Sequence, residues 1–126
     1  MGQQQLLLIV LGVIVVGIAV VVGINLFNAN AVSSNRDGVV SDLNNLGAMA
    51  QQYYKKPASM GGGGNAFTGW TLPTQLDTTA NGYYVATVNA QSVVIVGTGT
   101  EKNDAGNSIK HTATVKPTTI SVVLTQ

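Results

Sequence analysis

The sequence predicts an α+β protein, in which a long N-terminal helix, apolar and then amphipathic, packs on a small antiparallel β-sheet of about four strands. Three observations predict this class. Residues 6–24 form an uninterrupted apolar and glycine run, and every charged side chain lies at or after Arg36. Apolar residues then recur at intervals of three and four positions as far as Tyr53, which is helical spacing. Beyond Gly69 the chain is rich in Val, Thr and Tyr, the residues of strands.

The length of 126 residues allows one small domain and one extended element. We expect the helix to occupy residues 1–56 and a head domain, made of a loop and the sheet, to occupy residues 57–126. Six basic and five acidic side chains give a net charge of +1. The chain therefore lacks the strong positive electrostatic field that would attract a polyanion. Nucleic acid is therefore not an expected partner.

The apolar run, residues 6–24, is long enough to cross a bilayer, because about 20 apolar residues span the hydrocarbon core. A cleavable secretory signal has a positively charged start and a shorter apolar region of about 7–15 residues. Only uncharged side chains precede this run: Gly2, Gln3, Gln4 and Gln5. A typical membrane anchor carries Lys or Arg close to one end, but the nearest basic side chain is Arg36, about three turns beyond Ile24.

Glycines interrupt the apolar run at Gly12, Gly17 and Gly23. Small residues let membrane helices approach one another closely, which would make these positions a packing face. Glycine is also generally more frequent in membrane helices than in soluble ones, so the glycines alone do not decide between the two explanations.

The amphipathic half of the helix is predicted by one apolar stripe. Its members are Val32, Val39, Leu43, Leu46, Ala50 and Tyr53, and the polar residues assigned to the opposite side are Asp42, Asn44, Asn45, Gln51 and Gln52. Lys55 and Lys56 suit the negative end of the helix dipole, and Pro57 ends the helix. Residues 25–35 are rich in Asn and Ser, which are weak helix formers, so local unwinding is compatible with the sequence.

Residues 57–69 contain four consecutive glycines at 61–64 and are interpreted as a flexible crossing from helix to sheet. Four strands are expected, over residues 82–89, 92–97, 108–115 and 118–125. The run 93–96 is uniformly apolar, which predicts burial on both faces, and in the last strand Ile120, Val122 and Leu124 share one face. Tyr53, Tyr54 and Trp70 are expected at the joint between helix and sheet.

The sequence contains few side chains that could catalyse a reaction or bind a metal ion. It has no cysteine and one histidine, His111, for which an ordinary surface or edge position is favoured over a catalytic base. Glu101, Asn103, Asp104 and Asn107 supply the oxygens that calcium prefers, but the same residues suit a hairpin turn, which is the favoured interpretation. No cofactor, metal or catalytic residue is predicted, and we expect no enzyme.

This layout resembles the type IV pilins and pilin-like filament subunits. The resemblance rests on the start of the chain, Gly2 followed by Gln-Gln-Gln-Leu-Leu-Leu-Ile-Val-Leu-Gly12 and the rest of the apolar run, and on the architecture of the whole chain. It implies an extracellular filament at the cell surface, built from identical subunits that are stored in the inner membrane before assembly. It also implies a prepilin peptidase and a pilus assembly machinery as partners, with cleavage after Gly2, so that Gln3 becomes the first residue and is often methylated.

The resemblance assigns the filament core and self-assembly surface to the N-terminal run. The residues concerned are Gln3, Gln4, Gln5, Leu6, Leu7, Leu8, Ile9, Val10, Leu11, Gly12, Val13, Ile14, Val15, Val16, Gly17, Ile18, Val20, Val21 and Ile24. The family usually has a glutamate near the start of this run, where Gln5 or Leu7 stands here, and a basic leader, which is missing. We therefore expect Gln3, Gln4 and Gln5 to form amide hydrogen bonds between subunits instead.

Two alternatives share these features. One is a pseudopilin, a membrane-anchored component of a secretion system that forms only short assemblies. The other is a monomeric anchored domain that binds a ligand with its sheet. The role of a filament in adhesion, motility, DNA uptake or scaffolding does not follow from the sequence.

Overall fold

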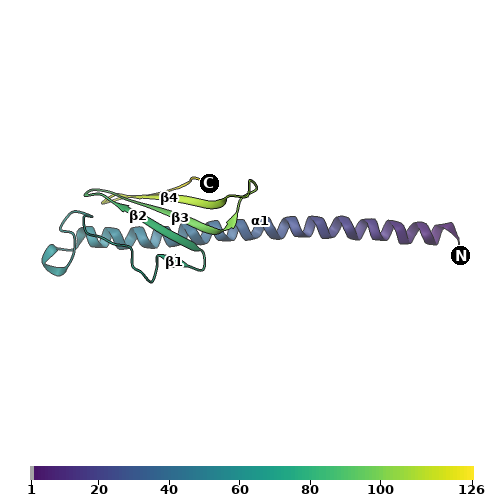
Figure 1. Cartoon of the computed structure of the whole chain (residues 1–126), viewed down its shortest axis with the longest axis horizontal. Coiled ribbons are helices and arrows are strands. Elements are labelled where there is room, and N and C mark those ends of the chain that lie inside the picture. Colours follow the sequence, from purple (N-terminus) through teal and green to yellow (C-terminus); the bar gives the residue numbers. More distant parts are fainter. Residues whose placement is uncertain (1) are drawn as a thin grey trace. The chain divides into compact units, whose positions relative to one another are not determined.

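The computed structural model describes residues 2–126 and contains one long helix and a five-stranded antiparallel sheet (Figure 1). Helix α1 spans Gln3–Lys55, and a single 3-10 turn follows at Ala58–Met60. The strands are β1 (Thr78–Thr79), β2 (Gly82–Val88), β3 (Val93–Lys102), β4 (Ser108–Val115) and β5 (Ile120–Leu124). The α+β prediction is confirmed. The sequence missed β1, because two residues are too few to show an alternating pattern.

The chain divides into two compact units, Met1–Ala31 and Val32–Gln126. This boundary lies within α1, because the apolar stripe of the second half of the helix packs on the sheet. We call residues 32–126 the sheet unit. The Asn-rich residues 25–35 are helical throughout, without the unwinding that their composition allowed.

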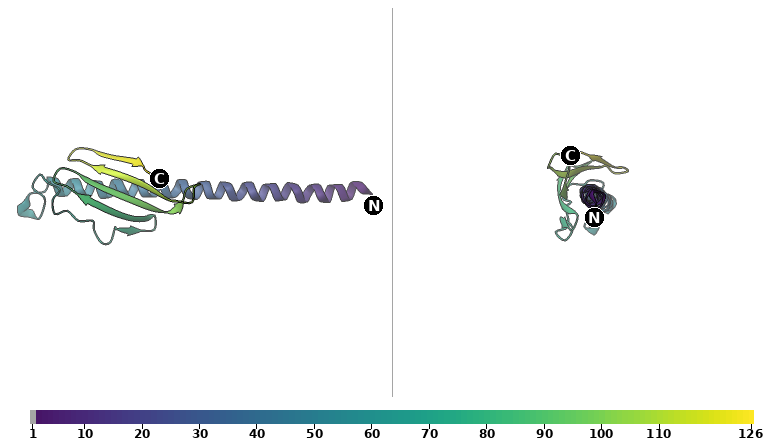
Figure 2. Two further views of the ribbon diagram at one scale, coloured as in Figure 1. Left: turned by 45° about the horizontal axis from the view of Figure 1, so that its top comes forward. Right: turned by 90° about the vertical axis from the view of Figure 1, so that its right-hand side faces the viewer.

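The sheet is a meander in which sequence neighbours are also spatial neighbours, in the order β1-β2-β3-β4-β5 (Figure 2). Every pair is antiparallel, as short connections favour. One face covers the second half of α1. On β3 this face carries Val93 and Ile95, both fully buried, whereas Val94 and Val96 on the other face are only half-buried. The predicted burial of one face of β3 against the helix is confirmed, and the burial of the other face against neighbours stays a prediction.

The core forms where the helical stripe meets this face. Val39, Leu43, Leu46 and Ala50 are buried, as the spacing predicted, against Phe67, Trp70, Tyr84, Ile95, Ala113 and Val115. Gly47 lies in the same stripe and brings the helix backbone close to the sheet. A Cβ at this position would lie 3.0 Å from Cδ1 of Ile120 and 3.2 Å from Cγ2 of Val115.

Two of the four glycines at 61–64 bind the C-terminal end of α1, so the segment is not simply a flexible crossing. The amide of Gly63 donates to the carbonyl of Tyr53 at 2.8 Å, and the amide of Gly64 donates to that of Lys56 at 3.0 Å. The last carbonyls of a helix lack partners within the helix, so the loop caps it. A Cβ on Gly63 would overlap the carbonyl oxygen of Ala66, which explains why the position is glycine.

The aromatic joint predicted at Tyr53, Tyr54 and Trp70 is confirmed. The hydroxyl of Tyr53 donates to the carbonyl of Thr68 at 2.9 Å, and the ring of Tyr54 lies 4.8 Å from that of Phe67. Trp70 is buried at 7% exposure, so its fluorescence reports on the sheet unit.

We expect Gly47→Leu to destabilise the sheet unit by about 1–3 kcal/mol, because a leucine side chain overpacks the contact with Ile120 and Val115. Thermal unfolding in detergent, followed by Trp70 fluorescence, measures this. Gly12→Leu is the matched control, since a Cβ at Gly12 has no neighbour within 4 Å. Equal unfolding midpoints for both variants and the wild type would show that the close approach at Gly47 is not needed.

Candidate functional site

The largest candidate site is the surface of the apolar run, residues 6–24. Every large apolar side chain in it is at least 50% exposed, from Leu6 at 66% to Ile24 at 55%. Within the described residues, α1 is the one helix long and apolar enough to cross a membrane, and none of its apolar window is buried inside the structure. This part of α1 could therefore be embedded in a membrane.

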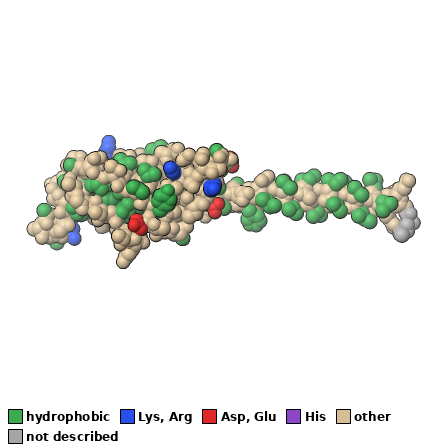
Figure 3. Space-filling model, in the orientation of Figure 1, with side chains coloured by type: hydrophobic (Ala, Val, Ile, Leu, Met, Phe, Trp, Pro, Cys, Tyr) green, Lys and Arg blue, Asp and Glu red, His purple; other side chains and the backbone are tan. Residues whose placement is uncertain are grey.

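Exposure of this surface to water would be costly. Burial of one large aliphatic side chain is worth about 1.5–3 kcal/mol, and the exposed set of Leu, Ile and Val in this run extends over the whole helix surface. On the face shown in Figure 3, hydrophobic side chains follow one another along this segment, and the charged side chains lie in the sheet unit. The run therefore needs cover from lipid or from other protein chains.

The glycines of the run have no function within the chain's own fold. A Cβ added at Gly12, Gly17 or Gly23 would have no neighbour within 4 Å. Gly38 and Gly47, in the second half of α1, differ from them because a Cβ there would meet the Asn81 side chain or the side chains of Ile120 and Val115. Gly12 and Gly23 are eleven residues apart, about three turns, and so lie on nearly the same side of the helix.

The residues predicted for assembly lie together, because all of them belong to the first part of α1. Gln3, Gln4 and Gln5 form its first turn and are exposed, and this turn contains no acidic residue. The amide of Gln5 donates to the carbonyl of Gly2 at 3.2 Å. The amide side chains thus form a polar, uncharged collar at the start of the apolar surface.

A second feature, in the sheet unit, is a polar network centred on Asp42. Its Oδ2 atom accepts hydrogen bonds from the Tyr84 hydroxyl at 2.6 Å, the Thr79 hydroxyl at 2.9 Å and Nδ2 of Asn81 at 3.1 Å. The prediction that Asp42 lies on the solvent side of the helix is wrong. At 100° per residue Asp42 lies only about 60° from Val39, at the border of the buried stripe.

Asn35 extends this network by two hydrogen bonds between α1 and the sheet unit's β-strands and turns. Its Nδ2 donates to the carbonyl of Asn81 at 2.7 Å, and its Oδ1 accepts from the amide of Glu101 at 3.2 Å. Gly38 lies between Asn35 and Asp42 along the helix, and any side chain there would collide with Asn81. We call Asn35, Asp42, Thr79, Asn81 and Tyr84 the Asp42 network.

Burial alone would raise the pKa of Asp42, but the hydrogen bonds from Tyr84, Asn81 and Thr79 outweigh it and hold the pKa below the ordinary value of 3.8. The pKa of Tyr84 is raised by burial and by its hydrogen bond to the Asp42 carboxylate. At neutral pH the pair is therefore an ionised carboxylate and a neutral phenol, which is the arrangement that gives a charge-assisted hydrogen bond.

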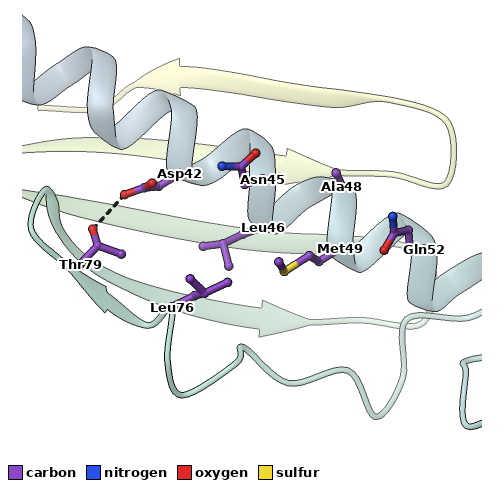
Figure 4. A pocket seen from close by; sticks show the side chains of 8 residues that line it. All are labelled: Asp42, Asn45, Leu46, Ala48, Met49, Gln52, Leu76 and Thr79. Atoms are coloured by element: carbon purple, nitrogen blue, oxygen red, sulfur yellow. Dashed lines mark hydrogen bonds between the residues drawn. The ribbon is translucent and has the colours of Figure 1, made fainter.

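A cavity of about 360 Å³ lies beside the Asp42 network, between α1 and the segment before β2 (Figure 4). Its lining is Asp42, Asn45, Leu46, Ala48, Met49, Gln52, Leu76 and Thr79. Figure 4 shows Asp42 and Thr79 pointing toward one another at one end of the cavity. Met49 lies between this pair and Gln52. The cavity has a mainly apolar lining and one carboxylate.

His111 is not on the surface or at an edge, contrary to the prediction. It lies on β4, between β3 and β5, at 7% exposure. Its Nδ1 atom is buried without a hydrogen-bond partner among the residues described. Burial, and then the positive charge of Arg36, hold the pKa of His111 below its ordinary value of 6.5.

The oxygen-rich segment that follows β3 is the turn that the sequence favoured. Oδ1 of Asn103 accepts hydrogen bonds from the amides of Ala105 and Asn107, both at 3.0 Å, which is how an Asx turn uses its side chain. Within residues 2–126 no group of three or more His, Cys, Asp or Glu side chains is arranged to hold a metal ion.

Comparison with protein-family models, with curated proteins and with solved structures finds no match for this chain. The exposed apolar surface and the sheet unit are therefore the two features that bear on the function of the chain.

We expect Tyr84→Phe to destabilise the sheet unit by about 1–2 kcal/mol at neutral pH, because it removes a donor from a partly buried carboxylate. The pKa of Asp42 is lowered in the folded state, so its contribution is present above the unfolded value and is lost as pH falls through the folded value. Chemical denaturation at pH 7 and at pH 2.5 measures both effects. A destabilisation at pH 2.5 equal to that at pH 7 would contradict the charge-assisted bond.

We expect the stability of the sheet unit to fall as pH drops below 6.5. Because the folded pKa of His111 is lowered, the unfolded chain takes up the proton first and is favoured at lower pH. Unfolding midpoints between pH 7.5 and pH 5 measure this decline. His111→Gln is the control for pH effects that do not involve the imidazole; if the stability of this variant declines as steeply as that of the wild type, His111 is not the cause.

Proposed function

We propose that this chain is the structural subunit of a type IV pilus-like extracellular filament, which polymerises through the apolar run of α1. One observation carries the proposal: a helical surface of 19 residues that is apolar on all sides, uncharged and without cover from the rest of the chain. The sheet unit has its own core and leaves this surface entirely to external partners.

The mechanism follows from where this surface is buried at each stage. Before assembly the run lies in the membrane, with lipid on all sides. In the filament the same side chains contact those of identical copies at staggered heights. The apolar area that lipid covered is then covered by protein, so little buried area is lost on extraction from the membrane. Head-to-tail contacts of this kind do not close on themselves and generate a helical fibre.

Gly12 and Gly23 support contact between helices over contact with lipid alone. Neither serves the chain's own packing, and both leave the helix backbone open to a neighbour on nearly the same side. Close backbone approach at small residues is a main source of affinity where apolar burial does not distinguish lipid from protein.

Gln3, Gln4 and Gln5 take the place of the glutamate that the pilin family usually has near the start of this run. Amide side chains both donate and accept, so they can bond to one another between copies without an ionised group. In a dry core an unpaired amide is costly, and such bonds would therefore fix the register between neighbouring subunits.

A membrane-anchored domain that binds a ligand is the second candidate. The cavity between α1 and Leu76 favours it, since its volume lies within the range of small-ligand sites, about 300–1,000 Å³. This candidate needs the apolar run as an anchor only and gives the glycines and glutamines no intermolecular contact.

The triple variant Gln3→Leu, Gln4→Leu, Gln5→Leu separates the two candidates. We expect it to remain in the membrane fraction, because it is more apolar than the wild type, and to reduce filament yield at least tenfold. Electron microscopy and immunoblotting of sheared cell surfaces measure the yield, and membrane fractionation measures anchoring. The triple Gln→Asn variant keeps the amides and should retain filaments.

Gly12→Leu with Gly23→Leu tests the same surface independently, with Val13→Leu and Ile24→Leu as a control that leaves the glycines in place. Filaments should be lost in the first double variant and kept in the second. An absence of wild-type filaments from the producing cells, with the chain in the membrane fraction, would contradict the proposal and support the anchored component.

A further inference from the structure

The sheet ends in an open edge at β5, because the strand order places β5 last and β4 is its only neighbour among the described residues. In Figure 2 this strand, coloured yellow, lies along the border of the sheet. An edge strand leaves half of its backbone amides and carbonyls unpaired, and these groups can pair with another strand.

The register identifies the unpaired groups. The amide of Thr125 donates to the carbonyl of Lys110 at 3.0 Å, and the amide of Lys116 donates to the carbonyl of Thr119 at 2.8 Å. Since bonded pairs alternate along an antiparallel ladder, Ser121 and Val123 also point their backbone groups toward β4. Ile120, Val122 and Leu124 therefore present their amides and carbonyls to the outside.

None of the usual protections covers this edge. Residues 118–126 include no charged side chain, and β5 contains no proline. The β4–β5 ladder runs through five consecutive pairs, in contrast to β3–β4, which is interrupted between Thr98 and Lys102. At the opposite edge of the sheet β1 has two residues, which pair with Gly82 and Tyr83 of β2. Natural sheets use charges, prolines, bulges or short strands to prevent edge pairing.

We propose that β5 pairs antiparallel with β5 of a second copy, centred on Val122. In this register Ile120 lies opposite Leu124 of the other copy and Ser121 lies opposite Val123, so that apolar side chains meet on the face that packs on α1. The outward amides and carbonyls of the three residues form six hydrogen bonds, two at each pair. The two sheets become one continuous sheet of ten strands.

A second copy suits this edge better than an unrelated strand for two reasons. On the face shared by Ile120, Val122 and Leu124 the segment is self-complementary about Val122, and no like charges are brought opposite one another. The β-branched residues Thr119, Ile120, Val122, Val123 and Thr125 also favour an extended strand on both sides of the pair.

This pairing uses a different surface from the apolar run and is independent of it. A two-fold contact closes after two copies and does not propagate. If the proposed filament exists, its subunits point in one direction, so a β5 pair would connect two filaments of opposite direction and bundle them. Single filaments without bundles would refute the pairing and leave the filament intact.

The test uses the full chain in detergent micelles, where the apolar run is covered. Amide hydrogen exchange is measured at low and high protein concentration. The amides of Ile120, Val122 and Leu124 should gain at least tenfold protection at high concentration, and those of Ser121 and Val123 should be protected at both. Protection of the outward amides that does not rise with concentration would overturn the proposal, as would protection that appears only with added cell extract.

Two proline variants provide the matched control, because the side chains of Val123 and Leu124 are similarly exposed, at 58% and 55%. Leu124→Pro removes an outward amide and should abolish association in sedimentation equilibrium while the sheet unit keeps its unfolding midpoint. Val123→Pro removes an inward amide and should lower that midpoint. Association of Leu124→Pro equal to that of the wild type would contradict the pairing.

The lack of cysteine allows a direct check of the register. In the proposed pair Val122 faces its own counterpart at a Cα separation of about 5.5 Å, which a disulfide can bridge. Val122→Cys should form an intermolecular disulfide at least tenfold faster than Ser121→Cys. The two copies of residue 121 do not face one another, because they are offset by two residues along the paired strands. Equal rates would overturn the register.

Discussion

The position of α1 on the sheet depends on one carboxylate oxygen. The apolar stripe supplies most of the buried area, but a stripe with helical repeat offers similar packing after a shift of one turn. Oδ2 of Asp42 removes this ambiguity, because its three donors come from β1, β2 and the turn between them and meet it at one position only. Asn35, two turns earlier, and Gly38, one turn earlier, reinforce the same position, since Asn35 bonds the Asn81 backbone and Gly38 leaves room for the Asn81 side chain.

The two halves of α1 differ in the contacts that they make with the rest of the chain. The second half is amphipathic, is capped by the glycine loop at 61–64 and has Gly47 where the sheet approaches closely. The first half has apolar side chains on every side and glycines that contact nothing. One half of α1 thus packs in the fold of the sheet unit, and the other half has no cover from the described chain, which is the basis of the proposed filament.

Patterns of several turns or several alternating residues made most of the fold predictable. The stripe at Val39, Leu43, Leu46 and Ala50 gave the buried face, and the Val- and Thr-rich segments gave four of the five strands. Predictions failed where tertiary contacts override local composition. Asp42 is polar, yet at the stripe border it meets donors more than 30 residues away, and His111 is buried because it shares the covered face of β4 with Ile109, Ala113 and Val115. The glycines at 61–64 indicated flexibility by composition, but the structure uses them for close contact with Tyr53 and Lys56.

Chain continuity through α1 has a mechanical consequence. Any pull on residues 3–31 reaches the sheet through the second half of the same helix, where the Asp42 network and the stripe lie side by side along the axis. Such a force acts on these bonds in shear, so that several must break together before the helix slides. Asparagine, aspartate, threonine and tyrosine side chains thereby give the domain tensile strength without a single covalent cross-link.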